Sequence, residues 1–262
     1  MLFFPNAKIN IGLNITSKRE DGFHNLETIF YPIKWCDALE ITPSKSLSFK
    51  SSGIPIPGDG NLCLKAYELM KGHYDLEPVD IHLHKNIPIG AGLGGGSSDA
   101  AFTLMGLNTI FDLGLDKIEL KKIALQLGAD CPFFIDNEPS LASGIGEVLR
   151  PTKLDLSAYH LFVVKPDIFV STAEAFSSII PHLTSKSIQE EVNRPIEDWT
   201  LKNDFEQSIF PQYPDLLEIK NKLIAAGAVY ASMSGSGSSI YGIFSEKPDL
   251  HFHNCHLFHQ VL

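Results

Sequence analysis

Apolar and polar residues alternate through much of the first 85 positions. Residues 7–15 (AKINIGLNI) and 79–85 (VDIHLHK) alternate in steps of two, and residues 28–41 form another β-rich run. Because successive side chains of a strand point to opposite faces, this spacing predicts strands in all three segments. Asp21-Gly22 is a hairpin signal and predicts a turn over residues 18–22.

Helical spacing predicts three helices in the same half of the chain, over residues 61–74, 97–108 and 116–128. Asp116 and Glu119 stand three positions apart, as in a capping box, and mark the start of the third helix. Gly128 marks its end.

The pattern restarts after Arg150-Pro151. It predicts a strand over 160–164, helices over 171–180 and 214–226, strands over 228–233 and 240–244, and an edge strand in the tail near 251–257. A Ser/Gly-rich turn, residues 234–239, separates two of these strands. We therefore predict an α+β protein with two lobes, residues 1–150 and 151–262, each built of a sheet and helices.

The composition limits the cell compartments and the classes of partner that suit this protein. The chain is 44 % hydrophobic, yet no apolar run is long enough for a membrane span. Residues 1–5 lack the basic segment of a signal peptide, and their apolar run is too short for one. A net charge of −10 argues against nucleic acid as a partner. The four cysteines show no C-x-x-C spacing, which indicates free thiols in a reducing compartment. We expect a soluble, cytoplasmic protein that binds neither nucleic acid nor membrane, and its state as monomer or homodimer is left open.

The glycine-rich loop, residues 88–101 (PIGAGLGGGSSDAA), carries the most specific chemistry. It follows the predicted strand 79–85 and leads directly into a predicted helix. Glycine lets the backbone approach a phosphate closely, and a helix N-terminus adds unpaired N–H groups and the positive end of its dipole. Ser97, Ser98 and Asp99 are residue types that cap helices, and both serine hydroxyls can reach a phosphate oxygen or its metal ion. The segment predicts a nucleotide-phosphate site.

Other phosphate and linker patterns fit this loop less well. A Walker loop requires Gly-Lys-Ser/Thr, and no lysine lies in this one. Gly90, Gly92 and Gly95 match G-x-G-x-x-G, but no acidic residue ends a second strand about 20 residues on, as dinucleotide binding usually requires. A flexible linker is disfavoured because the loop joins two strongly patterned elements.

Three polar positions elsewhere could carry chemistry. Lys8 and Asn10 share one face of the strand 7–15, where a solvent-facing lysine is the common alternative. Asp130 follows a predicted helix end, whose dipole does not favour an acid, so a lysine or a metal ion is expected to stabilise it. A turn before Pro132 explains Asp130 equally well.

The aromatic and histidine positions are more ambiguous. Phe23 and Phe30 suit a core, whereas His24 directly follows an exposed turn and is less easily explained by packing. The histidines of residues 251–256 lack the paired spacing of zinc sites, so we do not expect a metal there.

Three segments together resemble the GHMP small-molecule kinases. Residues 5–10 (PNAKIN), 88–101 and 233–239 match the N-terminal strand, glycine loop and C-terminal Ser/Gly motifs of that family in order and spacing. Residues 19–28 (REDGFHNLET) and 127–133 (LGADCPF) further resemble the branch of the family that phosphorylates the 2-hydroxyl of 4-diphosphocytidyl-2-C-methyl-D-erythritol in the non-mevalonate isoprenoid route. The resemblance implies the two-lobed GHMP kinase fold, with a ribosomal protein S5 domain 2-like, ATP-binding N-terminal lobe and a ferredoxin-like C-terminal substrate lobe.

The resemblance also implies a role for each matching residue, with ATP and Mg²⁺ as cofactors. Asp130 would be the catalytic base and Lys8 its partner. Asn61 would lie near the adenine, and Ser97 is the candidate Mg²⁺ ligand. The ATP phosphates would be held by Pro88, Gly90, Gly92, Leu93, Gly94, Gly95, Gly96, Ser97 and Ser98. His24 would hydrogen-bond the cytosine of the cytidine-linked substrate, and the other substrate residues would be Asn10, Phe23, Phe30, Phe176, Gly235 and Ser236.

The sequence departs from the family pattern at three of these places. Phe23 stands where a tyrosine is common, and Gly60 replaces the usual aspartate before Asn61. Residues 235–239 read GSGSS where Gly-Thr/Ser-Gly-Ala/Ser is typical, which is close enough to keep the substrate role of that turn. Two alternatives stay open. Another GHMP kinase, acting on mevalonate, homoserine or a sugar, would have no base for Phe23 and His24 to recognise. A non-catalytic nucleotide-binding module would not need both Lys8 and Asp130.

Overall fold

The computed structural model describes residues 1–58, 60–177, 179, 181 and 187–262. Packing divides the chain into two compact units that interleave along the sequence. Unit 1 comprises residues 1–8, 34–89 and 94–138, and unit 2 comprises residues 9–33, 90–93 and 139–262. A boundary of lobes between residues 150 and 151 stays a prediction.

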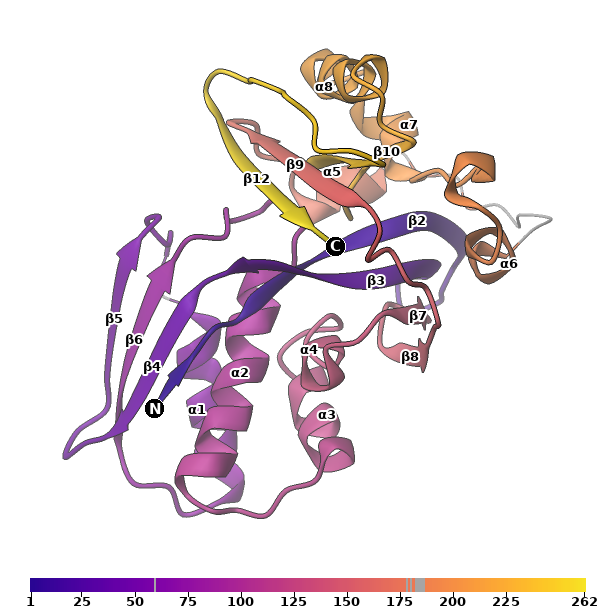
Figure 1. Cartoon of the computed structure of the whole chain (residues 1–262). Coiled ribbons are helices and arrows are strands. Elements are labelled where there is room, and N and C mark those ends of the chain that lie inside the picture. The colour runs from indigo at the N-terminus through magenta and orange to yellow at the C-terminus, as the bar shows by residue number, and fades with distance from the viewer. Residues whose placement is uncertain (59, 178, 180, 182–186) are drawn as a thin grey trace. The chain divides into compact units, whose positions relative to one another are not determined.

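Unit 1 contains a four-stranded sheet with two helices beside it. The strand order is β1 (Leu2–Phe3), β4 (Ala38–Pro43), β6 (Val79–Lys85) and β5 (Ser48–Gly53), and only β5 and β6 pair in parallel. Strand β6 buries Val79, Ile81 and Leu83 and exposes the residues between them, as its alternation predicts. Helices α1 (Leu62–His73) and α2 (Gly95–Ile110) pack side by side (Figure 1).

Helix α2 begins two residues before the predicted start. Gly94, with φ 70°, is its N-cap, and the Gly94 carbonyl accepts a hydrogen bond from the Ser98 N–H at 2.9 Å. A left-handed N-cap favours glycine, because other residues rarely adopt positive φ. Ser97, Ser98 and Asp99 therefore lie inside the first turns of α2 and do not cap it.

The remaining helices of unit 1 are short. Helix α3 (Lys117–Leu125) starts with the predicted capping box, in which Asp116 accepts from the Glu119 N–H and Glu119 accepts from the Asp116 N–H. It ends three residues before the predicted end, and turns lead from it to α4 (Phe133–Asp136). Asp130 lies in these turns rather than at the helix end.

Unit 2 holds most of a second sheet and all of a third. The second has the order β2 (Asn6–Lys18), β3 (His24–Cys36), β7 (Ser140–Ser143) and β8 (Val148–Pro151), with the start of β2 and the end of β3 in unit 1. The third is antiparallel throughout, in the order β10 (Tyr230–Met233), β11 (Ile240–Phe244), β9 (His160–Pro166) and β12 (Cys255–Val261) (Figure 1). The predicted edge strand in the tail is β12, which starts at Cys255.

In its described residues, unit 2 has the helices α5 (Thr172–Ser177), α6 (Ile188–Val192), α7 (Phe205–Ile209) and α8 (Pro214–Ala225), with a 3₁₀ turn at Ile196–Asp198. Helix α8 confirms the prediction for 214–226. The helix predicted over 171–180 is α5 in its described part, and residues 178 and 180 lie outside the described residues. Among the described helices, none combines the length and the apolar character that crossing a bilayer requires.

Candidate active site

Lys8 and Asp130 form an ion pair in unit 1. Lys8 Nζ lies 3.3 Å from Asp130 Oδ2. Strand β2 is buried on both faces from Asn6 to Ile15, so Lys8 is only 3 % exposed and is not the solvent-facing lysine that alternation allows. The Asp130 side chain is 33 % exposed. A buried ammonium thus holds a carboxylate that a ligand can still reach.

The first turn of α2 packs directly against this pair. A Cβ on Gly94 would lie 3.1 Å from Lys8 Cε and 3.0 Å from Phe134 Cζ, so the absence of a side chain lets the helix start sit on Lys8. Ser97, half-buried, hydrogen-bonds the thiol of Cys131, the neighbour of Asp130. Burial raises the pKa of Cys131 to about 12, and the bond from Ser97 opposes this only in part, so the thiol is neutral and unreactive at pH 7. The structure therefore gathers the helix start, the lysine and the aspartate in one place.

Asn61 is the N-cap of α1. Its side-chain oxygen accepts a hydrogen bond from the Cys63 N–H at 2.7 Å. Among the other loop residues of unit 1, Pro88 and Gly95 are buried and Gly96 is exposed. Within the described part of the chain, no three histidine, cysteine or acidic side chains gather in a way that could hold a metal ion.

In unit 2, residues 90–93 of the glycine loop are bonded to the Ser/Gly turn 234–239. Ser234 Oγ donates to the Gly92 carbonyl at 2.8 Å, and the Ser239 N–H donates to the Ala91 carbonyl at 3.1 Å. Gly92 has φ +73°, and a Cβ there would lie 2.0 Å from the Ser234 carbonyl oxygen. No other residue fits at position 92. Two motifs that are far apart in the sequence thus form one backbone cluster.

The candidate substrate residue Asn10 belongs to this cluster. Its N–H donates to Ser234 Oγ at 3.2 Å, and its side-chain amide donates to Thr28 Oγ1 at 3.1 Å. A Cβ on Gly235 would lie 3.3 Å from Asn10 Oδ1. Ser236, the next residue, is half-buried.

The aromatic candidates of unit 2 separate into three environments. The His24 ring stacks on Phe176, with ring centroids 4.9 Å apart and planes at 21°, and Phe205 meets Phe176 edge-on at 4.8 Å. In this conformation no base fits between His24 and Phe176. Phe23 is 59 % exposed and does not belong to the core that its residue type suggests, whereas Phe30 is 2 % exposed and does.

Two models of one protein family match this chain, one in each half of the sequence. The model of the GHMP kinases N terminal domain matches residues 61–138, and that of the GHMP kinases C terminal domain matches residues 186–251. A 4-diphosphocytidyl-2-C-methyl-D-erythritol kinase of Bacteroides fragilis is 54 % identical over 255 residues, which cover 94 % of this chain and 93 % of the relative. The chain belongs to the GHMP kinase family.

Further relatives of this GHMP kinase match it over nearly the whole chain. The protein of the same name from Cytophaga hutchinsonii is 49 % identical, with 97 % of this chain and 96 % of the relative covered. A crystal structure of a 4-(cytidine 5'-diphospho)-2C-methyl-D-erythritol kinase matches with a TM-score of 0.78 and 34 % identity, over 93 % of this chain and 90 % of that one. The Methanococcus jannaschii mevalonate kinase shares the fold alone, with a TM-score of 0.66 at 15 % identity over 99 % and 97 % of the two chains. The predicted α+β GHMP kinase fold, with N- and C-terminal domains, is confirmed.

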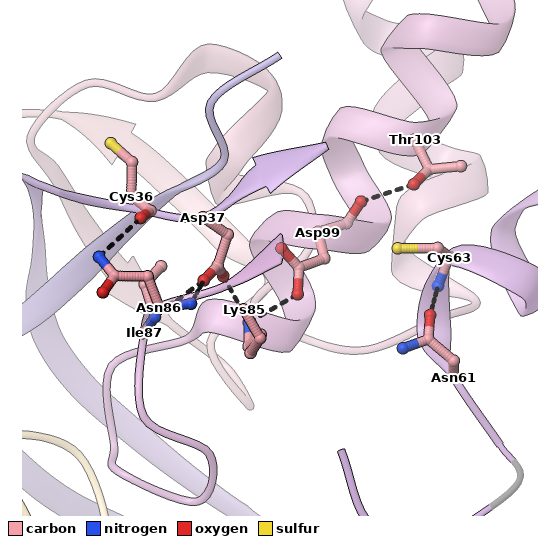
Figure 2. A network of polar contacts seen from close by, with 9 residues as sticks. All are labelled: Cys36, Asp37, Asn61, Cys63, Lys85, Asn86, Ile87, Asp99 and Thr103. Carbon is pink, nitrogen blue, oxygen red and sulfur yellow. Dashed lines mark hydrogen bonds and ion pairs between the residues drawn. The ribbon is translucent and has the colours of Figure 1, made fainter. Parts of the chain in front are cut away.

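One buried polar group of this GHMP kinase is not evident from the sequence pattern. Asp37, Lys85 and Asp99, here called the charge cluster, lie together at the base of α2 (Figure 2). Lys85 Nζ is 2.5 Å from Asp37 Oδ2 and 2.6 Å from Asp99 Oδ2. The available signals were a lysine that ends an otherwise alternating strand and an aspartate directly after the two loop serines.

Proposed function

We propose that this GHMP kinase transfers the γ-phosphoryl group of ATP to the 2-hydroxyl of 4-diphosphocytidyl-2-C-methyl-D-erythritol, in the non-mevalonate route to isoprenoid precursors. Relatives that carry this substrate in their names are 40–54 % identical over nearly the whole chain. The observation that carries the proposal within the molecule is the Lys8–Asp130 pair at the start of α2.

Asp130 acts as the base in this proposal. Its carboxylate accepts the proton of the 2-hydroxyl while the hydroxyl oxygen bonds to the γ-phosphorus and the bond from that phosphorus to ADP breaks. Lys8 holds Asp130 in place through the ion pair. Because phosphoryl transfer passes through a loose transition state, positioning and charge neutralisation supply most of the rate enhancement. The exposed fraction of Asp130 suits a group that must meet a substrate.

The N-terminal turn of α2 binds the phosphates of ATP. Gly94, Gly95 and Gly96 present backbone N–H groups without obstructing side chains, and the helix dipole adds positive potential at the same turn. Asn61 lies near the adenine and shapes that subsite by capping α1. The loop needs no lysine of its own, and Lys8 is left to pair with the acid.

Mg²⁺ fits this site as an ion carried by ATP rather than by a protein cage. Mg²⁺ keeps several waters and takes one or two protein oxygens beside the phosphates, so a dedicated cluster of acids is not required. Ser97 hydrogen-bonds Cys131, the neighbour of Asp130, and its hydroxyl is the one that would hold the ion. When bound, the ion neutralises charge on the transferring phosphates.

Unit 2 recognises the cytidine end of the substrate. The base takes the place on Phe176 that the His24 ring now occupies, and His24 turns to hydrogen-bond the base edge. Phe23, without the hydroxyl of a tyrosine, keeps its ring face for stacking. Asn10, Gly235 and Ser236 line the acceptor side through their cluster with Ser234. A cytoplasmic location, and a monomer or a homodimer, stay predictions.

A coupled assay of ADP release tests the acceptor. The purified chain is given ATP and Mg²⁺ with the cytidine-linked methylerythritol, mevalonate or homoserine in parallel. We expect ADP release with the first acceptor only. Release with mevalonate or homoserine, and none with the cytidine-linked compound, would overturn the substrate assignment in favour of another GHMP kinase.

A further inference from the structure

The charge cluster ties three elements of unit 1 to one ammonium group. Lys85 ends β6, Asp37 follows β3, and Asp99 lies in the second turn of α2 (Figure 2). The side chains of Lys85, Asp37 and Asp99 are 4 %, 0 % and 4 % exposed. None of the three is needed for the chemistry described above.

Asp37 fixes the chain just before the glycine loop. While Oδ2 pairs with Lys85, Oδ1 accepts hydrogen bonds from the Asn86 N–H at 2.6 Å and the Ile87 N–H at 2.8 Å. These two residues lead directly to Pro88. One carboxylate therefore holds both the end of β6 and the entry to the loop.

Lys85, on the other side of the charge cluster, lies against the start of α2. A Cβ on Gly95 would lie 3.1 Å from Lys85 Nζ and 2.9 Å from Ile87 Cγ2. Lys85 also binds Asp99 one turn further along α2, and Thr103 Oγ1 donates to the Asp99 carbonyl at 2.8 Å. Lys85 thus lies against α2 in two successive turns, beside Gly95 in the first and paired with Asp99 in the second.

In the charge cluster, burial and ion pairing oppose each other in their effects on the pKa values of Asp99 and Lys85. Burial raises the pKa of Asp99 to about 7, and the Lys85 ammonium opposes this only in part. Burial alone would lower the pKa of Lys85, but Asp99 and Asp37 outweigh it and raise that pKa. Asp99 Oδ1 and the neighbouring Ser98 Oγ are buried and find no hydrogen-bond partner in the part of the chain that the structure describes. A buried ion cluster of this kind is not needed for folding stability, because apolar side chains often replace such clusters without lowering the free energy of unfolding.

We propose that Lys85 is a positioning residue for nucleotide binding, which acts through Asp37 and Asp99 to fix the backbone N–H groups of the first turn of α2. The proposal rests on the proposed function in one respect, that this turn binds the phosphates of ATP. In this proposal Lys85 does not touch the nucleotide, because its side chain is only 4 % exposed and two of its three N–H donors are bonded to Asp37 and Asp99. Lys85 acts by holding the backbone N–H groups of this turn in fixed positions, so that they need not rearrange when the phosphates bind.

The test compares nucleotide affinity with stability. Binding of AMP-PNP with Mg²⁺ is measured by calorimetry on the full chain, together with the melting temperature, for Lys85→Met and for the triple variant Asp37→Asn/Lys85→Met/Asp99→Asn. Lys85→Met leaves two buried carboxylates unpaired and is expected to lose stability. The triple variant removes every charge of the cluster while keeping the side-chain sizes, and the amide oxygen that it places at position 37 can still accept hydrogen bonds. It therefore remains informative if the single variant does not fold.

We expect the triple variant to melt near the wild-type temperature but to bind AMP-PNP about tenfold more weakly, as for the loss of one well-placed hydrogen bond to a charged group. Its affinity for CDP, which probes the residues of unit 2, should not change. Lys121→Met is the matched control, because it removes a lysine from the ion pair with Asp136 elsewhere in unit 1 and should leave AMP-PNP binding unchanged.

A folded triple variant that binds AMP-PNP as tightly as the wild type would overturn the proposal. An equal loss of affinity in Lys121→Met would overturn it as well, since the effect would then not be specific to the charge cluster. Failure of the proposed function looks different. In that case the wild type binds AMP-PNP but does not phosphorylate the cytidine-linked acceptor, and the positioning role of Lys85 stands.

Discussion

Lys8 Nζ lies 3.3 Å from Asp130 Oδ2, and the two side chains differ sharply in exposure, at 4 % and 33 %. In the proposed mechanism this asymmetry separates their roles. The lysine is buried within β2, whereas about a third of the aspartate side chain stays exposed beside it. A surface salt bridge of two mobile groups would add little, but a buried cation that orients one accessible acid is a means of placing a base.

Replacing Lys8 by methionine tests this division. Methionine keeps most of the length and the apolar contacts under Gly94 while removing the charge. We expect kcat to fall about 100-fold, a usual loss when one preorganised electrostatic partner is removed, with little change in the KM for ATP. Steady-state kinetics with each substrate varied in turn checks this, and an unchanged kcat would speak against Lys8 as the partner of the base.

His24→Ala tests recognition of the cytidine. The variant removes the hydrogen-bonding group and uncovers the Phe176 face that His24 now occupies. We expect the KM for the cytidine-linked substrate to rise about tenfold while kcat changes little, because the lost contact is to a part of the substrate that does not react. A fall in kcat with an unaltered KM would remove His24 from base recognition.

The hydrophobic pattern predicted most elements because each buries one face. Strand β6 and helix α8 have the expected form for this reason. The capping box of α3 was predicted separately, from the spacing of Asp116 and Glu119. Strand β2 is the exception. Its alternation indicates one exposed face, but both faces are covered, and so Lys8 and Asn10 are buried. Alternation along one strand carries no information about what packs on its polar side.

The candidate site could be predicted only where residues lie in a motif. The glycine loop, Lys8 and Asp130 are found through such motifs, whereas the roles given to them stay predictions. The charge cluster could not be found in this way, because Lys85 is 48 positions from Asp37 and 14 from Asp99. Its members meet only after β6 and α2 have packed. The left-handed Gly94 that starts α2 was hidden for a related reason, since a run of glycines does not show which one adopts positive φ.

Gly92→Ala tests the joint between the glycine loop and the Ser/Gly turn. The new Cβ would overlap the Ser234 carbonyl, and φ +73° would be strained besides. We expect a loss of more than about 2 kcal/mol in the free energy of unfolding, measured by urea denaturation, since positive φ alone costs about 1–2 kcal/mol. Gly114→Ala is the control, because it has φ +68° but nothing within 4 Å of the added Cβ. Equal losses in both variants would show that the close contact contributes nothing.

The edge strand β12 should loosen in acid. His160 Nδ1 and His259 Nε2 are 3.2 Å apart with stacked rings, and burial, then His160 and Lys247, lower the pKa of His259. A histidine with a lowered pKa binds fewer protons folded than unfolded. Its contribution is therefore complete above a pH of about 6.5 and is lost as the pH falls through the folded pKa.

Hydrogen exchange of the β12 amides, corrected for intrinsic rates, checks the effect. We expect less protection at a pH of about 5 than at about 7.5. In His259→Phe, which keeps a ring beside Phe162 without a titrating group, the difference should disappear. The same pH dependence in that variant would assign the effect to other groups.

The role of Asp130 is tested most directly by a single turnover with saturating ATP, Mg²⁺ and the cytidine-linked methylerythritol, for the wild type and for Asp130→Asn. The variant keeps the shape of the side chain and cannot accept the proton. We predict that phosphoryl transfer slows at least about 100-fold, the usual contribution of a general base, while AMP-PNP binds as in the wild type. Transfer at the wild-type rate in Asp130→Asn would contradict the account.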